Sequence, residues 1–111
     1  MIIYKILTAD QWEALQRDRV TKGAPVDMAD GFIHFSTADQ CRETAARHFA
    51  DQEGLVLLAY RADNMTGLIW EPSRGGDLFP HLYGDLTLDH LVAASPLPLG
   101  PNGHVFPAGV A

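Results

Sequence analysis

The longest unbroken apolar run in the chain is the six-residue stretch LVLLAY at residues 55–60. A transmembrane helix needs about 20 apolar residues, so this run is too short to cross a bilayer. Six residues match the length of a β-strand, and a strand without polar alternation is typical of the centre of a sheet or of burial on both faces. The run therefore predicts a globular fold built around a buried strand.

Four further segments have the composition of β-strands. They combine the β-branched and aromatic residues that are enriched in strands, and they lie at residues 2–7, 32–35, 68–71 and 91–95. With the buried run they make about five strands, the first of which we expect near the centre of the sheet. Residues 21–30 and 73–77 hold glycine and aspartate residues typical of turns, so these segments are expected to be loops.

Two main helices are predicted by the residues that begin them. Thr8 with Gln11, and Thr37 with Gln40, have the spacing of a capping box. In this motif a hydroxyl and a side-chain amide satisfy backbone N–H groups at the start of a helix. Strands interleaved with two helices predict an α+β fold.

The chain is expected to form one domain. Its 111 residues suit a single hydrophobic core, and no repeat or linker-like tract divides it. We assign residues 1–98 to this α+β domain. Proline and glycine are frequent in residues 99–111, which are expected to be an irregular tail.

The charge of the chain limits its partners. The net charge is −6 at pH 7, which argues against nucleic acid because phosphate backbones select basic surfaces. The first residues lack the basic region and long apolar segment of a secretory signal. We therefore expect a cytoplasmic protein that binds neither nucleic acid nor membrane, and the sequence leaves its oligomeric state open.

Cys41 is the single cysteine, which excludes a disulfide within the chain. It shares helical spacing with Ala38 and Ala45. A small buried thiol is therefore expected at this position rather than a nucleophile.

A first candidate site lies in the stretch GFIHFSTADQ, where His34 interrupts an apolar strand. Phe32 and His34 are expected on one face of that strand. Ser36 and Thr37 follow at the start of the second helix, and N–H groups at a helix start attract anions. The alternative is that His34 only bonds the backbone and that the two hydroxyls only cap the helix.

A second candidate site lies in WEPSRGGDLFPHLYG at residues 70–84. Glycines beside Arg74 would let backbone amides and a guanidinium grip an anion together. Glu71 would act as a base or hold a hydroxyl, and His81 would act as an acid–base group. The alternative is an ordered surface loop in which Glu71 pairs with Arg74.

Several common catalytic centres are not indicated. The chain has enough histidines for a metal site, but no pair has zinc-motif spacing, so no metal is expected. It contains no G-x-S-x-G elbow, no P-loop and no G-x-G-x-x-G motif, which argues against hydrolase and nucleotide sites of those kinds.

Together, the segments IYKI, GFIHFSTADQ, LVLL and WEPSRGGDLFPHLYG resemble a small bacterial family catalogued as domain of unknown function nine-five-two. That family is grouped with the ADP-ribosyltransferase-like fold, which implies a split, mixed sheet with flanking helices and an NAD-like ligand between its halves. Ser36 and Thr37 resemble the Ser-Thr-Ser element of that fold, and Glu71 would stand for its catalytic glutamate. The first strand has Tyr4 and Lys5 where those enzymes place a histidine or arginine.

The sequence thus predicts a small-molecule site for a phosphate-bearing or NAD-like ligand. If the protein is an enzyme, the expected reaction is transfer or hydrolysis at a glycosidic or phosphoester bond, such as ADP-ribosyl or phosphoryl transfer. The expected catalytic residues are His34, His81 and Glu71. The expected ligand-binding residues are Ser36, Thr37, Ser73, Arg74 and Tyr83. The alternatives are a non-catalytic binding or interaction module with structural histidines, and an accessory protein that uses its proline-rich tail as the contact.

Overall fold

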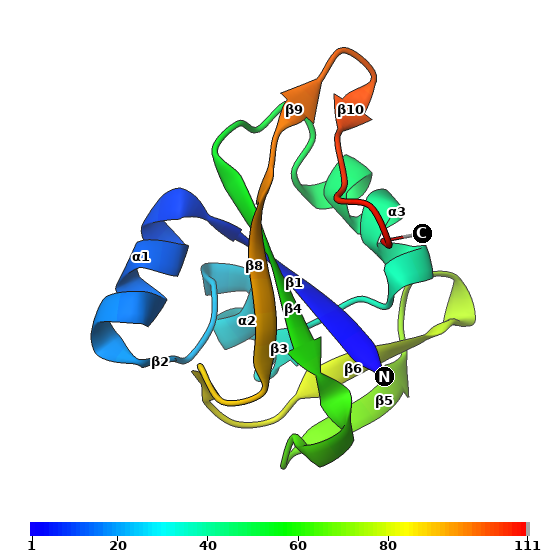
Figure 1. Ribbon diagram of the computed structural model, residues 1–111. Helices are drawn as coiled ribbons and strands as arrows, with labels where there is room; N and C mark the ends of the chain where they lie inside the picture. The colour runs from blue at the N-terminus through cyan, green and yellow to red at the C-terminus, as the bar shows by residue number, and fades with distance from the viewer. Residues whose placement is uncertain (111) are drawn as a thin grey trace.

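The computed structural model describes residues 1–110, with Arg74 described in its backbone alone. Figure 1 shows how its elements are arranged. The helices are α1 (Ala9–Asp18), α2 (Pro25–Asp30) and α3 (Ala38–His48), and the 3-10 turns are η1 (Ala62–Asn64) and η2 (Arg74–Gly76). The strands are β1 (Ile2–Thr8), β2 (Val20–Thr21), β3 (Ile33–His34), β4 (Leu55–Arg61), β5 (Leu68–Pro72), β6 (Leu78–Leu82), β7 (Leu86–Thr87), β8 (Leu91–Leu97), β9 (Leu99–Gly100) and β10 (Gly103–His104).

Three long strands form the first sheet, in the order β1-β4-β8, and both of its pairings are antiparallel. The apolar run of β4 lies in the middle of this sheet, as its composition predicted. β1 lies at the edge of the sheet rather than at its centre, because β8 pairs with the far side of β4. Tyr4 of this edge exchanges backbone hydrogen bonds of 2.8 and 2.9 Å with Ser36, which ties the first sheet to the chain after β3.

The second sheet has the order β3-β6-β5, and its middle strand, β6, was not among the five strands expected from the sequence. A proline lacks the N–H that a central strand needs, so Pro80 is an unusual residue at this position. β3 ends at His34. The hydrogen-bond ladder between β3 and β6 therefore stops just before the position at which an N–H from Pro80 would be needed. Pro80 takes part there only through its carbonyl, which accepts the Phe35 N–H at 3.0 Å.

Two clusters of buried side chains pack on the two faces of the first sheet. One cluster joins this sheet to α1 and the second sheet, and includes Ile3, Leu15, Ile33, Leu58, Tyr60 and Leu82. The other joins it to α3, and includes Ile6, Cys41, Ala45, Leu57 and Leu97. Figure 1 shows α3 on the opposite side of the first sheet from α1 and α2. This layering confirms the α+β class and the buried position of the cysteine.

Both predicted capping boxes are present. The Thr8 hydroxyl accepts the Gln11 N–H at 3.2 Å at the start of α1, and the Thr37 hydroxyl accepts the Gln40 N–H at 3.3 Å at the start of α3. In each case the glutamine side chain bonds the backbone N–H of the threonine in return. These motifs were predictable because all of their partners lie within four consecutive residues.

α2 lies in the segment that was expected to be a loop. Its six residues are too few to show a helical repeat in the sequence. Pro25 stands at its first turn, where a fixed φ favours a helix and no N–H is needed, and Gly31 ends it in the left-handed conformation with φ +86°. This short helix carries two of the side chains that shape the candidate site.

Three other expectations change. Every pairing among the described strands is antiparallel, so the expected mixed sheet is wrong, and the strands are more numerous than expected. The last segment is not irregular throughout, because β9 and β10 form a hairpin and Phe106 packs against the α3 cluster. No helix within residues 1–110 is long and apolar enough to span a membrane.

Candidate functional site

The structure brings His34 and His81 together on neighbouring strands of the second sheet. They stand directly opposite each other in the register of β3 and β6, and their ring centroids are 5.6 Å apart. The adjacent pair, Ile33 and Leu82, points into the core, so the two histidines share the other face of the sheet. The His34 N–H donates to Asp27 and not across the ladder, which makes this a non-hydrogen-bonded pair, the type in which side chains come closest.

His34 is held by carboxylates at both ring nitrogens. Its Nδ1 lies 2.5 Å from Oδ1 of Asp27, and its Nε2 lies 2.9 Å from Oδ2 of Asp30. The contact at Nδ1 is a hydrogen bond, and the contact at Nε2 is an ion pair when the ring is protonated. One third of the His34 side chain remains exposed.

Asp27 is the buried centre of this part of the site, with 1% of its surface exposed. Its second oxygen, Oδ2, accepts from Lys5 Nζ and from the Ala24 N–H, each at 2.8 Å. Burial by itself would raise the pKa of Asp27. The hydrogen bond from His34 and the charge and hydrogen bond of Lys5 outweigh burial and hold that pKa well below its usual range.

Lys5 reaches Asp27 from β1 and is itself buried, with 6% of its surface exposed. Burial lowers its pKa, and the charge of Asp27 offsets part of that lowering. Sequence reasoning noted Lys5 only as a departure from a family pattern and did not single out Asp27 or Asp30. The available signal was a lysine inside an apolar strand, because a lysine is almost never buried without a partner.

His81 has a carboxylate partner of its own. Its Nδ1 lies 2.7 Å from Oε1 of Glu71, and the Tyr83 hydroxyl donates to the same oxygen at 2.8 Å. The hydrogen bonds from His81 and Tyr83 lower the pKa of Glu71, and the bond to Glu71 raises the pKa of Tyr83. Three of the predicted site residues therefore form one hydrogen-bonded group.

Phe32 covers the histidine pair with its aromatic ring. It stacks on His81 at 4.1 Å between centroids and contacts His34 at 4.6 Å, with Tyr83 at 5.3 Å. His81 is 4% exposed as a result of this packing. Sequence reasoning placed Phe32 on the correct face but did not count it among the site residues.

Ser36 and Thr37 are engaged at the start of α3. The Ser36 hydroxyl lies 2.9 Å from the hydroxyl of Thr44, and the Thr37 hydroxyl caps the helix. The backbone of Ser36 bonds Tyr4 in β1. These hydrogen bonds link α3 to the first sheet and do not involve the histidine pair.

Ser73 and Arg74 lie in the loop between β5 and β6. Ser73 is exposed, and its N–H donates to the Asp77 carbonyl at 2.9 Å across the turn. The Arg74 side chain lies outside the described part of the structure. In the rest of residues 1–110, no three His, Cys, Asp or Glu side chains are grouped so as to hold a metal ion.

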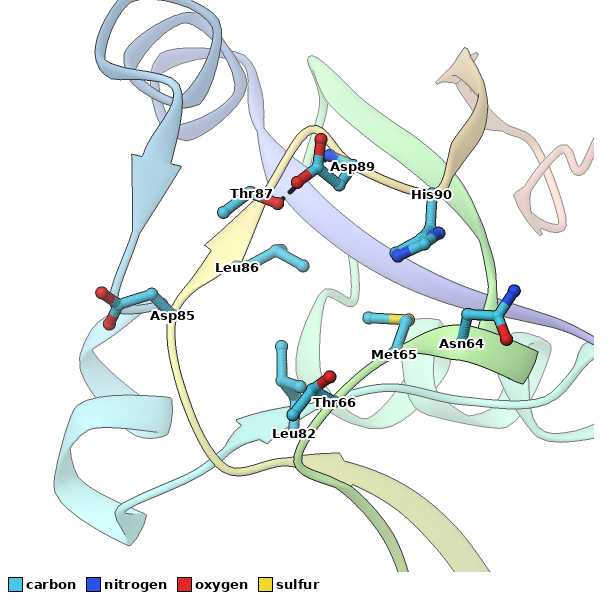
Figure 2. A pocket seen from close by; sticks show the side chains of 9 residues that line it. All are labelled: Asn64, Met65, Thr66, Leu82, Asp85, Leu86, Thr87, Asp89 and His90. Carbon is cyan, nitrogen blue, oxygen red and sulfur yellow. Dashed lines mark hydrogen bonds between the residues drawn. The ribbon is translucent and has the colours of Figure 1, made fainter.

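Two hollows flank the segment between β6 and β7. The larger, of about 310 Å³, lies beside the histidine pair, and its wall includes Phe32, Asp27 and Gly31. The smaller, of about 190 Å³, is shown in Figure 2, where Met65 and Leu86 point into it. Neither hollow has the rings of His34 or His81 on its wall, so the pair is reached from the surface or past Phe32.

Known structures of one bacterial protein are similar to this chain. The crystal structure of protein CC0527 from Caulobacter crescentus is 44% identical, with a TM-score of 0.89, over 94% of this chain and 92% of that chain. Its solution NMR structure has a TM-score of 0.83 over 93% of this chain and 90% of that chain. No curated protein matches the chain.

A family model matches residues 6–94, a range that includes both histidines and their three carboxylate partners. The family is described as a protein of unknown function. The match confirms the resemblance that the histidine-containing segments indicated. The chain therefore belongs to the family of proteins of unknown function named DUF952.

Proposed function

We propose that the chain binds a small phosphate-bearing or NAD-like molecule at the His34–His81 pair and exchanges protons with it. One observation carries this proposal: two imidazoles face each other on neighbouring strands, each with its Nδ1 on a carboxylate. A carboxylate at Nδ1 orients the ring and supports its charged form, which is how histidine is prepared for acid–base work. Histidines that only braced a core would not need this arrangement twice.

The two histidines are suited to different roles. His34, between two carboxylates, would give a proton from its charged form to a leaving oxygen. His81, with Glu71 as its single carboxylate partner, would take the proton of an attacking hydroxyl or water. The reaction class that fits these roles is transfer or hydrolysis at a phosphoester or glycosidic bond.

The aromatic side chains support a ligand with a flat ring. Phe32 already stacks on a histidine, and Tyr83 is 42% exposed beside it. A base or nicotinamide could stack on this surface. The grouping of the family with the ADP-ribosyltransferase-like fold is part of this proposal, as are Arg74 as a holder of the anion and a cytoplasmic location.

A second candidate is a non-catalytic binding module. It is favoured by the burial of His81 beneath Phe32 and by the completeness of its hydrogen bonds to Glu71. In that case the pair would brace the second sheet, and neither histidine would change its environment when small molecules are added.

Calorimetric titrations with inorganic phosphate, ADP-ribose and NAD test the proposal. The variants His34→Asn and His81→Asn keep a donor near the position of Nδ1, so each can still bond its carboxylate. The matched control is His48→Asn, at an exposed position at the end of α3. We expect at least one ligand to bind the parent protein and the control, and to lose binding in both site variants while circular dichroism shows the fold retained. Equal binding by all four proteins, or by none, would contradict the proposal.

A further inference from the structure

The two carboxylates on His34 differ in their surroundings. Asp27 is buried and has other partners, whereas Asp30 is almost half exposed, and its one observed ion pair is the contact of 2.9 Å with His34 Nε2. Asp30 is the last residue of α2 and precedes Gly31 in its left-handed turn. Its carboxylate can therefore swing into solvent without disturbing the buried pair.

The formal charges of this group sum to zero. With His34 protonated, Lys5 and the His34 ring contribute two positive charges, and Asp27 and Asp30 contribute two negative charges. Asp27 compensates the buried lysine, and Asp30 compensates the ring. Without Asp30 the group would carry one positive charge and an N–H directed at solvent, which are the properties of an anion site.

We propose that Asp30 occupies the place of the ligand's anionic oxygen on His34 Nε2, and that a phosphate or similar anion binds by displacing it. This inference rests on the proposed function and adds which atom the anion contacts. An exposed ion pair contributes little to stability, so the displacement is easy. The ligand replaces one negatively charged partner of the same ring nitrogen with another.

The hollow of about 310 Å³ lies on the Asp27 side of this group. Its wall includes Asp27 and Gly31 but neither His34 nor Asp30. Lys22 lies on the same wall and pairs with Asp85 at 3.2 Å. The contact between His34 and Asp30 therefore lies at the surface, where both side chains are partly exposed, and the hollow sets no limit on the size of the ligand.

Imidazole NMR of the full chain with inorganic phosphate tests the inference. The variants are Asp30→Asn, which keeps the shape of the side chain, and Asp30→Ala, which removes the competing acceptor. The control is Asp18→Asn, which removes an exposed carboxylate from the end of α1, where it pairs with Arg17. We expect the phosphate Kd, measured at the His34 ring, to fall by about fivefold in both Asp30 variants and to stay unchanged in the control.

Two results would overturn the inference. One is an unchanged Kd in both Asp30 variants, and the other is a phosphate effect that does not involve the His34 ring. If the parent protein binds phosphate, ADP-ribose or NAD at the histidine pair and the Asp30 variants bind with the same Kd, the inference falls and the proposed function stands. If phosphate leaves the pair unaffected in the parent and in both variants, and neither ADP-ribose nor NAD binds, both fall.

Discussion

Replacing Asp27 with Asn is expected to destabilise the fold by about 3–5 kcal/mol, because it leaves a buried ammonium group without its counter-ion. Asp27 Oδ2 accepts from Lys5 and Ala24, and Oδ1 accepts from the N–H and the ring of His34. Asparagine has one acceptor oxygen and one donor NH₂, so in either orientation its NH₂ faces donors that now lack an acceptor. A domain of this size is stable by about 5–15 kcal/mol, so the loss would be a large share of the total.

Urea unfolding followed by circular dichroism measures this loss. The control is Lys22→Met, which removes an ion pair between side chains that are 75% and 50% exposed and should cost no more than about 1 kcal/mol. Lys5→Met should also destabilise the protein, and the double variant Lys5→Met with Asp27→Asn should lose less than the sum of the two single losses. If Asp27→Asn is as stable as Lys22→Met, the buried pair does not organise this region as described.

The same carboxylate predicts how stability depends on pH. Its folded pKa lies below the value of about 3.9 for an unfolded aspartate. The folded state therefore binds fewer protons in this range, and the stabilisation is complete above the unfolded pKa and lost as the pH falls through the folded pKa. As the pH is lowered from about 5 to about 2, the free energy of unfolding should fall more steeply for the parent than for Asp27→Asn. Parallel curves for the two proteins would refute the lowered pKa of Asp27.

Three smaller predictions concern the surroundings of the site. Gly67→Ala should destabilise the protein more than Gly54→Ala in the same urea series, because a Cβ on Gly67 would lie 2.4 Å from the Tyr83 carbonyl oxygen whereas a Cβ on Gly54 would meet open space. Both glycines have positive φ, so similar losses of stability in the two variants would argue against this close approach. Glu71→Gln should lower the pKa of Tyr83 toward its ordinary value, and ¹³C NMR of the tyrosine ring checks this; an unchanged pKa would mean that their hydrogen bond is absent in solution. Burial raises the pKa of Cys41 to about 12, so a thiol reagent should label it only as fast as the protein unfolds, and rapid labelling of folded protein would contradict its burial.

The parts of the fold that depend on neighbouring residues were predictable from sequence. The capping box at Thr8 and the one at Thr37 each lie within four residues, and the apolar run of β4 needs no knowledge of its partners. The helical spacing of Cys41 with Ala38 and Ala45 was also sufficient to place it in the core. These features are local consequences of hydrogen bonding and hydrophobicity.

The site itself depends on contacts that no local pattern reveals. Lys5 and Asp27 are separated by 22 positions and meet only because a short unrecognised helix packs beside β3. His81 faces His34 because of the register of β6, a strand that was not expected from the sequence. The candidate residues could thus be listed from sequence, but their partners could not. For Ser36, the local pattern did not reveal that its hydroxyl bonds Thr44, and its predicted anion-binding role stays a prediction.

Imidazole ¹⁵N NMR of the parent protein, titrated with inorganic phosphate, ADP-ribose and NAD, tests the central claim most directly. If the pair is a ligand site, at least one of these molecules will shift the ring signals of His34 and His81 together, with a common Kd, and leave the ring of the exposed His48 unchanged. Ring signals of His34 and His81 that stay fixed in the folded protein with all three ligands would contradict the account and assign both histidines to bracing the second sheet.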